Sequence, residues 1–513
     1  MVVAMMHSSS AAPETRSSIT ARNLSFRYAA SGAGLHNISF SLNPGRTMLI
    51  TGPSGCGKST LLRLINGLIP HFDDGDLHGE ILLDSHGLAP TSGAGSMNPA
   101  KVPLHRSAEF SATVFQNPRR QFFTDTVITE LAFALENAGT DPGRIRNRID
   151  EVARTVGIED LLGRRLGELS GGQLQQVACA CALMPNTGII LFDEPTASLD
   201  SEAIATLREL LQLLRSLGKT IVIAEHRIAP LHGLVDDALI IDNGEISASL
   251  SAEEFFAISE QQRQAWGLRS LTPVPLPPLP RLHNLSEPET NPTRGLVLDN
   301  VVFSRKSPGG ALRGIRRDER RILDIDHLVF PAGEVTAVIG PNGTGKTTLG
   351  RLICGLEKPQ RGGSIRLNGK RLSAAERNRR CQMVMQDVSR QLFSETVAGE
   401  IELGAKEPPP TQSLLEQMDL AGLDKRHPRS LSGGQRQRLV IAAAKAQNAD
   451  VYVFDEPTSG IPWRHLESIA QRLEELATAG AVVIVITHDN ELIEAAATRI
   501  ADLSPFSPHL AFH

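Results

Sequence analysis

Short apolar runs alternate with longer segments of mixed polarity along this chain. Two of the runs lead into a glycine-rich loop, two end in an acidic pair and two end in histidine: MLIT, VTAVIG, GIILFDE, VYVFDE, TIVIAEH and VVIVITH. Their length and β-branched content predict buried strands, and the segments between them are long enough for helices. Strands that alternate with helices predict a parallel sheet covered by helices on both faces.

The chain contains two copies of one pattern. LSGGQ and FDEPT each occur twice at a spacing of 262 residues, whereas 288 residues separate Lys58 from Lys346 and 270 separate Gln116 from Gln386. The first copy is therefore longer between its lysine and its glutamine. We expect the extra residues to be the Gly/Ser/Pro-rich stretch 87–103, as a surface loop.

A proline-rich stretch, LTPVPLPPLPRLHNLSEPETNP, separates the two copies. Such a density of proline prevents both helix and ladder formation and predicts a semi-extended linker. We therefore expect a disordered tail over residues 1–16, a first domain over 17–250, a helical tail and linker over 251–294, and a second domain over 295–513.

Composition excludes several classes of function. The net charge of −5 leaves no basic surplus for nucleic acid. The five cysteines form no CxxC pair, which argues against a zinc site or a disulfide framework. No apolar run approaches the ~18–20 residues needed to span a bilayer, so any membrane role is expected to be peripheral and to depend on a partner.

Each copy contains one match to GxxxxGK[ST] between a predicted strand and a predicted helix. Glycines let such a loop wrap phosphate groups, the lysine reaches the β- and γ-phosphates, and the Ser or Thr hydroxyl is a ligand for Mg²⁺. A single match could be a chance glycine-rich turn, but two in the same context are not. The predicted binding residues are Gly52, Pro53, Ser54, Gly55, Cys56, Gly57, Lys58, Ser59 and Thr60, and Gly340, Pro341, Asn342, Gly343, Thr344, Gly345, Lys346, Thr347 and Thr348.

An acidic pair ends a predicted buried strand in each copy. Asp193 and Asp455 are placed to hold Mg²⁺ opposite the phosphate loop, together with Ser59 and Thr347. The next residues, Glu194 and Glu456, are candidates for the general base that polarises an attacking water.

The two LSGGQ motifs identify a family resemblance. Both halves resemble ABC-type nucleotide-binding domains, which implies two tandem P-loop NTPase domains of the α/β class. Each would have a mainly parallel core sheet, an antiparallel β part and a helical subdomain. The signature residues are Ser170, Gly171, Gly172 and Gln173, and Ser432, Gly433, Gly434 and Gln435.

The resemblance assigns further roles and implies ATP and Mg²⁺ as ligands. Gln116 and Gln386 match the Q-loop glutamine, which senses Mg²⁺ and the γ-phosphate, and His226 and His488 match the switch histidine. In this family each signature motif docks on the γ-phosphate held by the opposite domain. The resemblance therefore implies that Lys58 works with Ser432, that Lys346 works with Ser170, and that the two halves pair within one chain.

Three departures from the family pattern predict unequal sites. Tyr28 fits the aromatic position that stacks on adenine, although a packed strand tyrosine is the alternative, and its counterpart is Arg305. The loop after the acidic pair ends in Asp200 in the first copy but in Pro462 in the second. The residue before the switch histidine is glutamate in one copy and threonine in the other. We expect ATP binding at both sites and hydrolysis that is possible at both but unequal.

The stretches QNPRRQFFTDTV and QDVSRQLFSETV are similar to those of energy-coupling-factor importer ATPases. The resemblance implies a motor for vitamin, precursor or metal-ion uptake at the cytoplasmic face of the membrane. Its partners would be a transmembrane coupling subunit and a small membrane-embedded substrate-binding subunit. Gln121, Phe122, Gln391 and Phe393 would face the coupling subunit, unless the phenylalanines belong to the core. The alternative is a soluble tandem ABC ATPase associated with the ribosome, which typically has a long charged helical linker instead of a proline-rich one.

Overall fold

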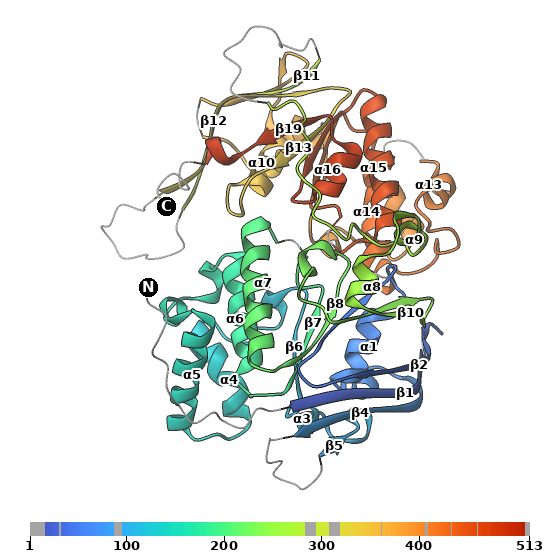
Figure 1. Ribbon diagram of the computed structural model, residues 1–513. Coiled ribbons are helices and arrows are strands. Elements are labelled where there is room, and N and C mark those ends of the chain that lie inside the picture. The colour runs from blue at the N-terminus through green and yellow to red at the C-terminus, as the bar shows by residue number, and fades with distance from the viewer. Residues whose placement is uncertain are drawn as a thin grey trace. The chain divides into compact units, whose positions relative to one another are not determined.

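The computed structural model divides the chain into two compact units, residues 1–273 and 274–513 (Figure 1). It describes residues 16–29, 32–86, 95–197, 199–282, 294–306, 319–360, 362–405, 409–431, 433–458 and 460–507. The predicted tail therefore lies outside the described residues, except for Arg16, which begins the first strand.

Two sheets form the β part of the first unit. An antiparallel sheet has the order β2-β1-β4-β5, with β1 (Arg16–Tyr28), β2 (Gly34–Leu42), β4 (Gly75–His86) and β5 (Ser96–Met97). A second sheet has the order β10-β9-β3-β8-β7-β6, with β3 (Thr47–Thr51), β6 (Ser111–Val114), β7 (Ile189–Asp193), β8 (Thr220–Ala224), β9 (Asp237–Asp242) and β10 (Glu245–Ser251). All neighbours in this second sheet are parallel except β9 and β10.

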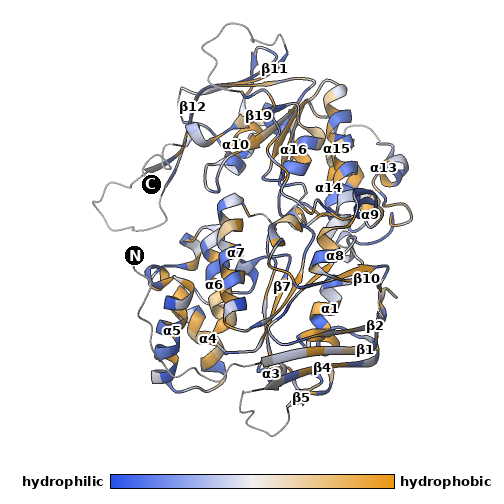
Figure 2. Ribbon diagram, viewed as in Figure 1, coloured by the Kyte–Doolittle hydropathy of each residue, from blue (hydrophilic) through white to orange (hydrophobic). Residues whose placement is uncertain are grey.

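The helices of the first unit are α1 (Lys58–Ile65), α2 (Leu68–His71), α3 (Leu104–Ser107), α4 (Val127–Asn137), α5 (Pro142–Val156), α6 (Gly171–Leu183), α7 (Ser201–Ser216), α8 (Ala252–Phe256) and α9 (Glu260–Ala265). Helices α4, α5 and α6 pack on one another and form the helical subdomain. Figure 2 shows the central strand β7 as hydrophobic and α7 as two-faced, as expected for a buried sheet under amphipathic helices.

The second unit repeats this arrangement. Its antiparallel sheet has the order β12-β11-β14-β15, with β11 (Gly295–Lys306), β12 (Glu319–Pro331), β14 (Ser364–Leu367) and β15 (Lys370–Arg371). Its parallel sheet has the order β16-β17-β18-β13-β19, with β13 (Val335–Ile339), β16 (Cys381–Val384), β17 (Val451–Asp455), β18 (Val482–Ile486) and β19 (Arg499–Asp502). Its helices are α10 (Lys346–Ile353), α11 (Ala374–Arg380), α12 (Val397–Glu402), α13 (Thr411–Gln417), α14 (Gly433–Ala446), α15 (Trp463–Thr478) and α16 (Asn490–Ala496). The two-domain α/β fold is therefore confirmed.

The expectation of a surface loop over residues 87–103 was wrong in part. Part of the insertion 87–103 is built into the sheet, because Met97 pairs with Leu83 and is buried; residues 87–94 lie outside the described residues. The stretch after β10 contains two short helices, α8 and α9, and its apolar residues pack into the first unit. Phe255, Leu268 and Leu271 are buried in the core of the first unit. Apolar residues in both segments gain more from burial than a solvated loop would offer.

Candidate nucleotide-binding sites

The phosphate loop of the first unit connects β3 to α1. Gly52 has φ +144°, and a Cβ atom there would lie 2.0 Å from the carbonyl oxygen of Ile241, so only glycine fits. The side chain of Lys58 is buried, and its Nζ donates to the carbonyl oxygens of Gly52 at 3.1 Å and Pro53 at 2.9 Å. The loop thus holds an ammonium group at the N-terminus of a helix, where anions are favoured.

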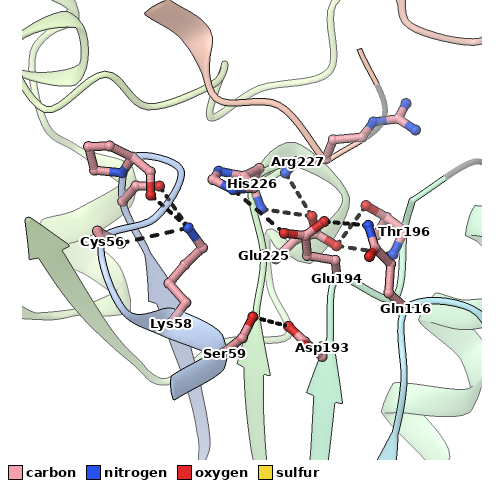
Figure 3. Close-up of polar contacts among 12 residues, drawn as sticks. Cys56, Lys58, Ser59, Gln116, Asp193, Glu194, Thr196, Glu225, His226 and Arg227 are labelled. Atoms are coloured by element: carbon pink, nitrogen blue, oxygen red, sulfur yellow. Dashed lines mark hydrogen bonds and ion pairs between the residues drawn. The ribbon is translucent and has the colours of Figure 1, made fainter. Parts of the chain in front are cut away.

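The two predicted Mg²⁺ ligands of this unit lie side by side. Ser59 Oγ donates to Asp193 Oδ1 at 3.1 Å, which joins the start of α1 to the end of β7 (Figure 3). Burial raises the pKa of Asp193, and the hydrogen bond from Ser59 opposes that rise. An all-oxygen donor pair beside a lysine suits a hard cation bound to phosphate, so these residues fit Mg²⁺ with ATP.

Glu194 is the centre of a polar cluster beyond the end of β7. Gln116 Nε2 donates to its Oε2 at 2.7 Å, and His226 Nε2 lies 3.6 Å from its Oε1 (Figure 3). Burial, followed by repulsion from Glu225, raises the pKa of Glu194 to about 8. The residue has φ +47°, a left-handed conformation that is uncommon outside glycine and is concentrated at functional sites.

Glu225 precedes the switch histidine at a position where the second copy has threonine, and the structure shows its contacts. Its Oε2 accepts from the backbone N–H and the hydroxyl of Thr196 at 3.0 and 2.8 Å. Its Oε1 accepts from the N–H groups of His226 at 2.7 Å and Arg227 at 3.0 Å. A buried carboxylate therefore connects the turn after Glu194 to the loop that carries the switch histidine.

The second unit builds its phosphate loop in the same way. Lys346 Nζ donates to the carbonyl oxygens of Gly340 at 2.7 Å and Pro341 at 2.9 Å. Thr347 Oγ1 donates to Asp455 Oδ2 at 2.8 Å. Burial raises the pKa of Asp455, as it does for the aspartate of the first unit. The same oxygen pair is thus available to Mg²⁺.

The surroundings of the second glutamate differ. Glu456 also has a left-handed φ, of +50°, and His488 Nε2 lies 3.8 Å from its Oε1. Thr487 Oγ1 donates to Glu456 Oε2 at 3.3 Å in place of the carboxylate found in the first unit. The turn is instead held by Asp489, whose Oδ2 accepts from Thr458 Oγ1 at 2.6 Å. In the first unit the stabilising carboxylate, Glu225, directly precedes the switch histidine. In the second unit the stabilising carboxylate, Asp489, directly follows it.

The Q-loop glutamines occupy corresponding positions in the two units. Gln116 is bonded to the glutamate described above, and Gln386 is exposed after β16. In each unit, the histidine, the acidic pair and the phosphate loop of that unit lie close together.

The first signature motif forms the N-terminus of α6. Gln173 N–H donates to Ser170 Oγ at 3.3 Å, and Ser170 N–H donates to Gln173 Oε1 at 3.0 Å. This capping box leaves Gly171 exposed at the first helical position. In the second unit α14 begins at Gly433, and Ser432 lies outside the described residues.

The candidate adenine-stacking residue is half-buried in β1. The hydroxyl of Tyr28 lies 3.2 Å from Thr60 Oγ1, and its ring meets the ring of Phe26 edge-on at a centroid distance of 4.8 Å. The phosphate loop and this ring are therefore joined through α1. Arg305 lies exposed on β11 of the second unit.

The loops after the acidic pairs end differently. Asp200 caps α7, with its carboxylate accepting from the N–H of Ala203 at 2.9 Å. Pro462 occupies the N-cap of α15 and supplies no side-chain acceptor. Such a cap contributes about 1 kcal/mol.

The segment after each Q-loop forms the same turn in both units. Glu130 Oε2 accepts from the N–H groups of Phe123 and Thr124, and Glu400 Oε2 accepts from those of Phe393 and Ser394. Phe123 and Phe393 project outward, with 75% and 76% of their surface exposed.

Gln121, Phe122 and Gln391, which were expected to face the coupling subunit, are half-buried. Gln121 Oε1 accepts from the N–H of Phe115 at 3.0 Å, and Gln391 Oε1 accepts from that of Met385 at 2.7 Å. Phe122 packs against the core of its unit. Backbone N–H groups left open by the turn attract the amides inward, because an unpaired donor there would be costly.

Comparison with known proteins gives the family. A family model described as ABC transporter matches residues 35–197 and 323–459. The chain belongs to the ABC transporter family. A protein of Treponema denticola, provisionally named an ABC transporter ATP-binding protein, is 36% identical over 491 residues, which is 95% of each chain.

Two solved structures are similar to this chain. An archaeal ribosome recycling factor, aABCE1, solved in a complex with the ribosomal stalk protein aP1, is 21% identical, with a TM-score of 0.55 over 94% of this chain and 87% of its own. The cbiO1 protein of Clostridium perfringens, described as part of the ABC transporter complex cbiONQ, is 29% identical, with a TM-score of 0.41 over 48% of this chain and 93% of its own. The former likeness concerns the fold alone.

This chain is thus a tandem ABC ATPase with two ABC domains. ABC ATPase domains in general bind ATP with Mg²⁺. Within the described residues, no helix is long and apolar enough to cross a bilayer.

Proposed function

We propose that the chain is the ATP-binding and ATP-hydrolysing motor subunit of an ABC importer of the energy-coupling-factor type. It would act at the cytoplasmic face of the membrane, in the uptake of a vitamin, a vitamin precursor or a metal ion. Its partners would be a transmembrane coupling subunit and a small membrane-embedded substrate-binding subunit.

The residues of each unit divide the work of hydrolysis. Lys58 and Lys346 would hold the β- and γ-phosphates, and the Ser59–Asp193 and Thr347–Asp455 pairs would hold Mg²⁺, with Gln116 and Gln386 beside them. Bound Mg²⁺ would neutralise phosphate charge. Glu194 and Glu456 would accept the proton of the attacking water. His226 and His488, which lie beside these glutamates, would orient the γ-phosphate and the water.

Each complete ATP site would take parts from both units. Ser170, Gly171, Gly172 and Gln173 would complete the site of Lys346, and Ser432, Gly433, Gly434 and Gln435 would complete that of Lys58. The capped and exposed start of α6 supports this role, because a helix N-terminus with exposed glycine can approach an anion closely. Covalent connection gives the units a high effective concentration for such pairing.

The pair of exposed phenylalanines carries the importer proposal. Phe123 and Phe393 are 270 residues apart, the same spacing as the two Q-loop glutamines. Ile128 in the first unit and Leu403 in the second add further exposed apolar surface close by in the sequence. A duplicated apolar surface held in the same conformation indicates a partner that contacts both units in the same way.

The structure of the turn connects this surface to the nucleotide site. Phe123 ring-stacks on Phe133 of α4 at a centroid distance of 5.0 Å. Gln121 joins the turn to the backbone of Phe115, next to Gln116. A partner bound at Phe123 would therefore be two hydrogen bonds away from Glu194.

The test is affinity purification of the tagged full chain from detergent-solubilised membranes of its own host, followed by mass spectrometry. We expect a multi-spanning membrane protein and a small membrane-embedded protein to copurify. A double variant, Phe123→Ser with Phe393→Ser, should lose both partners. Phe72→Ser, which alters a residue 69% exposed elsewhere in the first unit, should retain them.

Two results would refute the importer proposal. One is recovery of ribosomal proteins with the chain absent from the membrane fraction, which would favour the translation-associated alternative. The other is retention of the membrane partners by a double variant whose thermal unfolding matches that of the unsubstituted chain.

A further inference from the structure

The two units complete the same edge of their parallel sheets in different ways. In the first unit β10 pairs with β9, and Leu250 lies opposite Ala238. In the second unit the residue that corresponds to Ala238 is Ile500 in β19. Its partner is not a β10 equivalent but Arg281 of the interdomain linker, which forms a parallel bridge with it. Ile500 N–H donates to the carbonyl of Pro280 at 2.9 Å, and Leu282 N–H donates to the carbonyl of Ile500 at 2.7 Å.

Apolar side chains fasten the same stretch of linker to the second unit. Leu276 and Leu279 pack against a buried cluster formed by Ala337, Ile493 and Ile500. Leu282 is only 6% exposed and belongs to the core of the second unit. Residues 274–282, here called the strap, are therefore packed against the second unit and hydrogen-bonded to it.

The strap shares its apolar cluster with the segment that leads into the phosphate loop. Ile339, which directly precedes Gly340, packs against the same buried cluster as Leu276 and Leu279. At its other end, Asn490 Nδ2 donates to the carbonyl of Val274 at 2.8 Å. Asn490 lies two residues after His488 and begins α16.

This polar contact has no equivalent side chain in the first unit. The position that corresponds to Asn490 at the 262-residue spacing is Ile228, which is fully buried in the core. The first unit thus holds its switch loop by apolar packing and by Glu225. The second unit holds its switch loop by Asp489 and by a hydrogen bond to the strap.

We propose that the strap supports the second ATP site by fixing the start of α16, and that Asn490 is a positioning residue for His488. The strap fixes the start of α16, and the loop before it carries the histidine that faces Glu456. The inference rests on the proposed hydrolysis at the second site and is independent of the membrane partner. Loss of a single hydrogen bond of this kind would lower turnover at that site by about three- to tenfold.

Asn490→Asp replaces the hydrogen-bond donor by a carboxylate that the carbonyl of Val274 repels. The variant keeps the size of the side chain but has no donor for the carbonyl of Val274. A carboxylate at the first turn of a helix is favourable, so the variant should not unfold. Leu279→Ser loosens the strap from a second direction, and Pro278→Ala is the matched control, because Pro278 is exposed on the same segment.

The first measurement is amide hydrogen exchange of the nucleotide-free full chain. Asn490→Asp and Leu279→Ser should increase exchange in residues 487–493, and Leu279→Ser also in 335–340. Exchange in residues 225–231, the corresponding switch region of the first unit, should not change. Unaltered exchange in residues 487–493 of both variants would overturn the proposal, whatever the ATPase activity.

The second measurement resolves the two sites. The chain is incubated with Mg²⁺, vanadate and 8-azido-ATP, irradiated, and the labelled peptides are assigned to residues before or after the unit boundary. We expect Asn490→Asp to reduce vanadate-dependent label on the second unit about three- to tenfold and Pro278→Ala to leave it unchanged. An equal reduction on both units, or none on the second, would refute the role of Asn490. Absence of label in the unsubstituted chain would refute the proposed hydrolysis, and the exchange data would still decide whether the strap holds the loop.

Discussion

Replacing Glu194 by glutamine removes the carboxyl group whose pKa is displaced furthest within the first ATP site. Its pKa is raised from 4.5 to about 8, mainly by burial and then by Glu225, with Asp193 adding to the rise and Lys58 opposing it. In the folded, nucleotide-free protein the group therefore keeps its proton at pH values where the unfolded chain has lost it. Between pH 4.5 and about 8 the unfolded state binds fewer protons, so stability falls as pH rises and levels off above about 8.

The size of the effect follows from the same displacement. At about 1.4 kcal/mol for each pH unit, ionised Glu194 destabilises the folded state by at most about 5 kcal/mol above pH 8. The side chain is 16% exposed, and glutamine can still accept the hydrogen bond from Gln116, so we expect Glu194→Gln to recover about 2–3 kcal/mol. For a unit of this size that is about 4–10 °C in the melting temperature.

The assay is thermal unfolding of the full chain with EDTA and without nucleotide, at several pH values from about 5 to about 9. The gain of Glu194→Gln over the unsubstituted chain should be small at pH 5, grow toward pH 8 and then stay constant. Glu202→Gln, at an exposed position in α7, controls for the loss of one charge. A gain that is independent of pH, or one that shrinks as pH rises, would show that burial does not hold the proton on Glu194.

Two further outcomes follow from the unequal loops after the acidic pairs. Pro462→Asp should restore an N-cap to α15 and stabilise the second unit by about 1 kcal/mol, whereas Asp200→Ala should cost the first unit about as much; urea unfolding with a probe in each unit measures both. If the loop with Pro462 supports the Lys58 site less well, Glu456→Gln should reduce ATPase activity about fivefold more than Glu194→Gln, as a difference of about 1 kcal/mol requires, and equal losses would remove the asymmetry.

The repeated motifs made both phosphate loops, both acidic pairs and the two-domain α/β fold predictable. Their spacing within strand–loop–helix segments is local, and parallel strands place their C-terminal ends at one edge of a sheet. For that reason Ser59 and Asp193, 134 residues apart in sequence, could be expected to lie together, and their 3.1 Å hydrogen bond agrees with the prediction.

Residues whose position depends on a partner distant in sequence could not be placed from their local pattern. Gln121 and Phe122 had the character of surface residues, but Gln121 accepts a hydrogen bond from the backbone of Phe115 and Phe122 packs partly against the core. The proline-rich stretch had the composition of a linker, but its residues 280–282 pair with a sheet edge of the second unit.

By itself, the sequence determined the ABC family and predicted the chemistry of this protein: two copies of a candidate phosphate-binding loop, each with its carboxylates, histidine and signature motif. These motifs can be recognised because their residues lie close together in the chain and recur at a fixed spacing in the second copy. Only the tertiary structure decided the exchange of Glu225 for Asp489, the outward direction of Phe123 and Phe393, and the attachment of the strap at Ile500 and Asn490. Each of these depends on burial and hydrogen bonding between distant segments, and a side chain's neighbours across the fold are not encoded in its local pattern.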